Sequence, residues 1–155
     1  MSNPYRPPEA VVRDQDRPRG SPLKAVTLGV LTDIVGTAAA SVLLSFIYGI
    51  VLAAGGASVE EITDAAAHLD PGSALSIVGF AIGTGFSFLG GYVCARVAGR
   101  DELRWASVVA VISIGIGFVI GAQVYAAELN VLLAIFGIAA VMAGGYVGAR
   151  QNLKA

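Results

Sequence analysis

Four long apolar segments run through the chain, and they restrict its possible folds more than any other feature. A helix needs about 20 mostly apolar residues to cross the hydrocarbon core of a bilayer. Each segment reaches that length, and Asp33 is the one acidic residue inside them. Charged residues are only 14% of the chain, whereas they are about 25% of an average soluble domain. The sequence therefore predicts an all-α membrane protein with four transmembrane helices, at 25–54, 74–98, 105–127 and 129–149.

The two ends of the chain differ from the apolar segments. Residues 1–23 contain five of the six prolines and show no apolar periodicity. This composition is typical of a disordered tail, which we expect to be cytoplasmic. The transmembrane bundle is then expected at 24–150, followed by a short cytoplasmic C-terminus at 151–155.

The loop at 55–73 contains a helix signal. Ser58 and Glu61 have the spacing of a capping box, in which each side chain bonds to the backbone of the other residue. We therefore expect a short amphipathic helix to begin at Ser58 and to lie on the outer side of the membrane. Its weak apolar face would consist of Val59, Ile62, Ala66 and Leu69.

All ten basic residues lie on one side of the expected bundle. They precede the first span, surround the turn between the second and third spans, or follow the fourth span. The other two loops contain none. Because loops rich in Lys and Arg remain in the cytoplasm, we expect both termini there. The ten residues are Arg6, Arg13, Arg17, Arg19, Lys24, Arg96, Arg100, Arg104, Arg150 and Lys154.

A seven-residue repeat ends the second and fourth expected spans. Residues 90–96 read Gly-Gly-Tyr-Val-Cys-Ala-Arg and residues 144–150 read Gly-Gly-Tyr-Val-Gly-Ala-Arg, which agree at six of seven positions. Both copies end a helix on the same side, so we expect two related hairpins inserted in the same direction, not an inverted pair. These helix ends resemble those of small, uncharacterised bacterial inner-membrane proteins with four predicted helices. The resemblance implies a class and an inner-membrane location, but no activity.

Small residues recur at every fourth position of the expected spans. Helices associate in lipid through close van der Waals packing, which small side chains permit. We interpret these residues as packing positions within the bundle, with the alternative that one row remains free for a membrane-protein partner or a second copy. The expected packing residues are Gly79, Gly83, Ser87, Gly91, Ala95, Gly117, Gly121, Gly144 and Gly148.

Asp33 is an ionisable residue in a span, which makes it a candidate functional residue. Counting about 20 residues back from Ala54 places Asp33 near the cytoplasmic interface, level with Arg96 and Arg150. We therefore expect an ion pair between Asp33 and one of these arginines. The alternative is a proton or cation site at the foot of a polar stripe that consists of Asp33, Thr37, Ser41 and Ser45.

Groups that carry catalysis are sparse. Cys94 is the one cysteine, so an internal disulfide is excluded, and we interpret it as a packing residue. Glu60, Asp64 and His68 share a face of the expected short helix, which favours a solvated polar surface over a weak metal site. The phosphate-binding, dinucleotide-binding, hydrolase and zinc-protease motifs are absent. We expect no enzyme activity, no cofactor or metal and, at a net charge of −1, no nucleic-acid partner.

Two functions fit this sequence. The first is a structural or partner-binding accessory protein of the lipid bilayer, because packing residues abound and Asp33 is the one acidic residue within the spans. The alternative is a protomer of a homo-oligomeric small-solute or ion transporter or channel that uses the polar stripe of the first span. A path for solutes usually contains polar or ionisable residues near the middle of the membrane, and here the sequence offers hydroxyl groups and glycine.

Overall fold

The computed structural model describes residues 20–68, 70–121 and 126–153. Within these residues the chain forms helices and no strands, and all helices except the second are long and apolar enough to cross a membrane. The prediction of an all-α protein with four spans and one short additional helix is confirmed. The helices are α1 at Pro22–Ala54, α2 at Val59–Ala67, α3 at Ala74–Ala98, α4 at Glu102–Gly121 and α5 at Ala127–Asn152.

Local signals explain where α1 begins and α3 ends. The Ser21 side chain accepts a hydrogen bond from the backbone N–H of Lys24, and Pro22 occupies the first turn, where its missing N–H is not needed. α1 therefore begins within the segment predicted as tail, most of which lies outside the described residues. α3 ends at Ala98, and the next residue, Gly99, has a φ of 67°, a left-handed conformation that glycine adopts without strain.

The connection between α4 and α5 differs most from the prediction. The expected third span extended to residue 127, but α4 ends at Gly121 and Ala127 already belongs to α5. Between them lie residues 122–125, outside the described structure, and the non-helical Ala126. The expected boundary between the two spans fell at Glu128, whereas Glu128 lies in the first turn of α5.

The end of α5 also differs from the prediction. α5 continues to Asn152, past the expected end at residue 149. The Asn152 side-chain amide donates hydrogen bonds to the carbonyl oxygen of Ala95 (2.9 Å) and to the carboxylate of Glu102 (3.2 Å). These bonds join the last turn of α5 to the adjacent ends of α3 and α4.

The capping box of α2 is confirmed. The Ser58 hydroxyl accepts a hydrogen bond from the backbone N–H of Glu61 (3.2 Å), and the Ser58 backbone N–H donates to the Glu61 carboxylate (2.8 Å). Of the expected apolar face, Ile62 is half-buried near Gly49 of α1, whereas Val59 is exposed. Leu69 lies outside the described residues.

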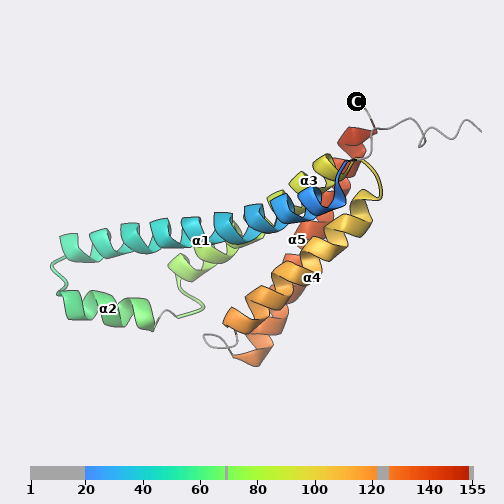
Figure 1. Ribbon diagram of the computed structural model, residues 1–155. Helices are drawn as coiled ribbons and strands as arrows, with labels where there is room; N and C mark the ends of the chain where they lie inside the picture. Colours follow the sequence, from blue (N-terminus) through green and yellow to red (C-terminus); the bar gives the residue numbers. More distant parts are fainter. Residues whose placement is uncertain (1–19, 69, 122–125, 154–155) are drawn as a thin grey trace, which may run out of the picture.

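The four long helices form two hairpins that diverge from one end of the molecule (Figure 1). In the first hairpin α1 packs against α3, and in the second hairpin α4 packs against α5. The two hairpins meet mainly through contacts between α3 and α5. We call the end where the hairpins meet the basic end, because α1 and α4 begin there and α3 and α5 end there, with their basic residues Lys24, Arg96, Arg104 and Arg150. The opposite end, where the hairpins are far apart, is the α2 end.

The buried core lies in the half of the molecule near the basic end. Side chains from α1, α3, α4 and α5 meet there, and all of them are small or medium in size. Close packing between the two hairpins is therefore found in this half, and the hairpins separate beyond it (Figure 1). The core residues are Ala25, Cys94, Ala98, Val109, Ala110 and Val141.

Candidate functional site

A cleft of about 640 Å³ separates the two hairpins. All four spanning helices line it, and Ala66 and Ala67 of α2 line it as well. Its volume lies within the range of small-molecule sites, about 300–1,000 Å³. The walls are mainly apolar, with side chains such as Ile34, Leu44, Phe80, Ile114, Phe118 and Leu133.

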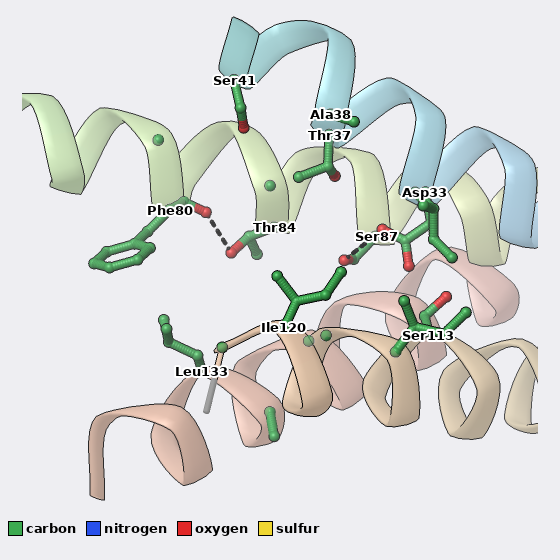
Figure 2. A pocket seen from close by; sticks show the side chains of 18 of the residues that line it. Asp33, Thr37, Ala38, Ser41, Phe80, Thr84, Ser87, Ser113, Ile120 and Leu133 are labelled. Atoms are coloured by element: carbon green, nitrogen blue, oxygen red, sulfur yellow. Dashed lines mark hydrogen bonds between the residues drawn. The ribbon is translucent and has the colours of Figure 1, made fainter. Parts of the chain in front are cut away.

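The polar stripe of α1 faces this cleft. Asp33, Thr37, Ser41 and Ser45 all line it, on the wall formed by α1. They occur at every fourth position, so they follow one face of the helix. Thr84 and Ser87 add hydroxyl groups from α3 (Figure 2).

Asp33 lies at the narrow end of the cleft, next to the core. Its side chain is 5% exposed, and its Oδ1 atom accepts a hydrogen bond of 2.9 Å from the Ser87 hydroxyl. Gly90 allows α3 to approach this point, because a Cβ atom at Gly90 would lie 2.9 Å from the Asp33 Cβ atom and 2.7 Å from the Gly29 carbonyl oxygen. A larger residue at position 90 would push the two helices apart.

Ser113 of α4 completes the polar end of the cleft. Figure 2 shows Asp33, Ser87 and Ser113, on three different helices, around the same space. The Ser113 hydroxyl is buried, and no atom of the described residues forms a hydrogen bond with it. A buried hydroxyl without a partner is unfavourable, so this oxygen is available to a ligand or a water molecule in the cleft.

Asn130 of α5 is a cleft residue that the sequence interpretation missed. It is 5% exposed and donates a hydrogen bond of 3.2 Å to the carbonyl oxygen of Phe118. Its side chain also lies against Gly121, the last residue of α4. The available signal was a lone amide near the start of an apolar segment, a position where polar residues usually face the membrane surface.

The expected ion pair of Asp33 with Arg96 or Arg150 is not formed in the described part of the chain. Arg96 donates a hydrogen bond of 2.9 Å to the Asn152 side chain, and Arg150 lies over the ring of Tyr146, 5.6 Å from its centre. The physical reason is helix register. Asp33 is level with Gly90, nearly two turns from Arg96 toward the middle of α3.

The expected packing residues fall into two groups. In the first, the residues lie where α3 and α5 contact each other. A Cβ atom at Gly144 would collide with the backbone carbonyl of Phe88, and one at Gly148 would lie 2.8 Å from the Cβ atom of Ala95. The residues of this group are Gly91, Ala95, Gly144 and Gly148.

The residues of the second group line the cleft instead. A Cβ atom at Gly117 would meet nothing within 4 Å, and one at Gly83 would lie 3.6 Å from the Thr37 methyl group, an ordinary contact. These small residues widen the cleft, since larger side chains would fill it. The group consists of Gly79, Gly83, Ser87, Gly117 and Gly121. Gly121 is also a contact position, because a Cβ atom there would collide with the Asn130 side chain.

The polar face of α2 lies outside this site. Asp64 and His68 form the one ion pair found in the described part of the chain, with 3.1 Å between His68 Nδ1 and Asp64 Oδ1. Both side chains are more than three-quarters exposed. Glu60 is exposed on the same helix, and the described residues contain no group of three side chains placed to hold a metal ion.

The four spans define the chain as a multi-pass membrane protein. Comparison with known proteins found no matching family model, curated protein or solved structure. The functional argument therefore depends on the cleft and its side chains.

Proposed function

We propose that the protein is a protomer of a small-solute or ion transporter and that the cleft is its substrate site. One observation supports this proposal above the others: the polar stripe Asp33, Thr37, Ser41 and Ser45 lines a cleft between helices. Polar groups in a span that serve only to hold helices together would be enclosed by their neighbours. Here Ser41 and Ser45 are exposed and Thr37 is half-buried.

The position of Asp33 fits a transport role. Ionisable residues inside membrane proteins face a bundle interior or a water-filled cavity, and they mark substrate or ion pathways. Asp33 is at the end of the cleft where α1, α3 and α4 meet, and the buried core lies directly behind it. A solute that reached Asp33 from the α2 end would need a change in helix packing to continue toward the basic end.

The charge distribution supports an orientation for this path. Lys24, Arg96, Arg104 and Arg150 lie at the basic end, and the loop of α2 contains no Lys or Arg. By the positive-inside rule, the basic end would face the cytoplasm and the cleft would open to the outside of a bacterial inner membrane. The side of the cleft that faces lipid in one chain would be closed by a second copy in a homo-oligomer.

Cysteine accessibility tests this function without knowledge of the substrate. The only native thiol is removed as Cys94→Ala, which keeps the Cβ atom in the core. Thr37→Cys and Ser41→Cys then place single thiols in the cleft. Val42→Cys, on the same helix, places one on a side that is 70% exposed and does not line the cleft. An impermeant methanethiosulfonate reagent is added to right-side-out or inside-out vesicles.

We expect the cleft thiols to react much faster than the Val42→Cys thiol, because the reactive thiolate requires water. A transporter must also expose its site to the other face, so Thr37→Cys should react from both sides of the membrane, at different rates. Equal rates for cleft and lipid-facing thiols would refute an aqueous cleft. Reaction from one side only would refute transport.

A second candidate function is that of an accessory subunit that binds another membrane protein. It is favoured by an open position on the second hairpin, because a Cβ atom at Gly115 would meet nothing within 4 Å and Gly115 does not line the cleft. Glycine on an open helix face lets another helix approach closely. A stoichiometric partner, purified with the protein from native membranes in mild detergent and lost with Gly115→Leu, would support this function over transport. Recovery of the protein alone, or only with copies of itself, would count against it.

A further inference from the structure

The loop that flanks the cleft at the α2 end is acidic. It contains four carboxylates and no Lys or Arg. None of the four lines the cleft, to which α2 contributes Ala66 and Ala67. A concave opening with charges of one sign raises the local concentration of the opposite charge. The carboxylates at this end therefore favour the approach of cations over anions. They are Glu60, Glu61, Asp64 and Asp70.

Inside the cleft, Asp33 has no cationic partner among the described residues. It is the one ionisable side chain among the described lining residues, and no Lys or Arg lines the cleft with it. Its Oδ1 atom accepts one hydrogen bond, from Ser87. A carboxylate can accept about four hydrogen bonds, so most of its capacity is unused, and an ionised Asp33 in apolar surroundings requires a counter-charge.

The remaining polar groups near Asp33 are hydroxyl oxygens. The Ser113 hydroxyl is buried without a partner, and Thr37 lies one turn from Asp33 on the same face of α1 (Figure 2). A ligand with two or three N–H donors on a positive nitrogen could bond to Asp33 and to these oxygens together. An ammonium group has this geometry.

The rest of the cleft is apolar and far larger than a bare ion. Beyond Asp33 its walls carry Ile114, Phe118 and Leu133. A metal ion at Asp33 would leave most of the 640 Å³ without contacts, whereas burial of an apolar body contributes about 25 cal/mol per Å² of surface removed from water. The cleft therefore matches a molecule with one charged end and one apolar end.

We propose that the cleft binds an amphipathic organic cation, a primary or secondary ammonium with an aromatic or branched apolar body. The ammonium group donates to the Asp33 carboxylate and to the Ser113 hydroxyl, and the apolar body lies along α4 and α5. This inference rests on the proposed transport function and names the class of its substrate.

The test uses three probes that share a naphthyl group and differ in charge. The purified full chain in lipid nanodiscs is titrated with 2-(1-naphthyl)ethylammonium, 2-(1-naphthyl)ethanol and 1-naphthylacetate, and naphthalene fluorescence reports binding. Empty nanodiscs correct for partition into lipid. We expect the ammonium to bind about tenfold or more tightly than the alcohol, since the free energy of one charge-assisted hydrogen bond corresponds to about this ratio of dissociation constants. The carboxylate should bind most weakly.

Variants assign the charge preference to Asp33. Asp33→Asn keeps an acceptor for Ser87 and should remove the preference for ammonium over alcohol. Asp33→Glu keeps the charge and should retain the preference. Glu128→Gln, which removes a carboxylate that does not line the cleft, should bind all three probes as the parent does. Size-exclusion profiles and melting temperatures verify that each variant is folded.

Two results would overturn the inference: equal affinity of the parent for ammonium and alcohol, or an unchanged preference in folded Asp33→Asn. Neither would contradict the proposed function if the cleft thiols react with the aqueous reagent from both sides, because that experiment does not depend on the ligand. Unreactive cleft thiols would instead refute the proposed function itself.

Discussion

Ser87 of α3 donates a hydrogen bond of 2.9 Å to Asp33 of α1. The two residues are 54 positions apart in the chain, and their bond joins the two helices of the first hairpin at the narrow end of the cleft. It is also the one polar contact of Asp33 among the described residues. The Ser87 hydroxyl therefore holds the carboxylate in position while leaving its second oxygen free.

Removal of the Ser87 hydroxyl should weaken the first hairpin. A hydrogen bond to a charged group contributes about 1.5–3 kcal/mol in soluble proteins, and polar bonds between membrane helices contribute about 0.6 kcal/mol on average. We expect Ser87→Ala to cost about 1–2 kcal/mol in the free energy of unfolding, measured by denaturant titration in mixed micelles. Thr32→Val is the control, since the Thr32 hydroxyl bonds to the backbone carbonyl of Leu28 in its own helix. Equal costs for both variants would contradict the prediction.

Asp33 and Arg96 should contribute to stability independently. Arg96 bonds to Asn152 and Asp33 bonds to Ser87, so the two residues share no partner. Changes at residues without shared partners add to within about 0.3–0.5 kcal/mol. In a double-mutant cycle of Asp33→Asn and Arg96→Gln we expect a coupling energy within this range. A coupling of 1 kcal/mol or more, on the order expected for contacting residues, would indicate that Asp33 and Arg96 do form an ion pair.

The contact between α3 and α5 should tolerate no added methyl group at Gly144. A Cβ atom there would collide with the Phe88 carbonyl, whereas one at Gly137 of the same helix would meet nothing within 4 Å. Overpacking typically costs about 1–3 kcal/mol, and we expect Gly144→Ala to lower the melting temperature in detergent accordingly. Gly137→Ala is the matched control and should leave the melting temperature unchanged or raise it. A similar response of the two variants would show that the helices are not closely packed at Gly144.

The start of α2 should lose stability in acid. Hydrogen bonds from the Ser58 backbone N–H and hydroxyl lower the pKa of the Glu61 carboxyl below its usual 4.5. A carboxyl group with a lowered pKa in the folded state stabilises that state above its unfolded pKa, and the contribution is lost as the pH falls through the folded value. We expect hydrogen–deuterium exchange in α2, corrected for intrinsic rates, to accelerate as the pH falls below about 4.

The substitution Glu61→Gln provides the control for this pH dependence. Glutamine can complete a capping box without titrating, so protection of α2 should then vary less with pH. Ser58→Ala should reduce protection at all pH values, because it removes the acceptor for the Glu61 backbone N–H. If the Glu61→Gln variant kept the full acid sensitivity, another group would be responsible.

The spans and the polar stripe could be predicted from the sequence because both are local patterns. Long apolar segments have few structures available in lipid other than helices, and residues at every fourth position share a helix face. Asp33, Thr37, Ser41 and Ser45 therefore had to lie together, whatever they faced. The capping box at Ser58 was predictable for the same reason, since all its atoms come from four consecutive residues.

The neighbours of Asp33 on the other helices could not be predicted in this way. The count that placed it at the interface assumed a span of about 20 residues that ends at Ala54, whereas α1 has 33 residues. The level of Asp33 is set by the contact of Gly29 with Gly90, which no local pattern reveals. The two groups of small residues could not be told apart for the same reason. Small residues at every fourth position occur both where α3 and α5 contact each other and in the wall of the cleft.

Because α1 is long, the thickness of the surrounding bilayer would affect the shape of the cleft. Its 33 residues extend about 50 Å, whereas the hydrocarbon core is about 30 Å thick. Even a tilt of about 40°, the upper end of the usual range, leaves about 38 Å along the membrane normal. α1 is also one wall of the cleft. A thinner bilayer would tilt this wall further from the second hairpin and a thicker one would bring it upright, so membrane thickness would act on the width of the cleft.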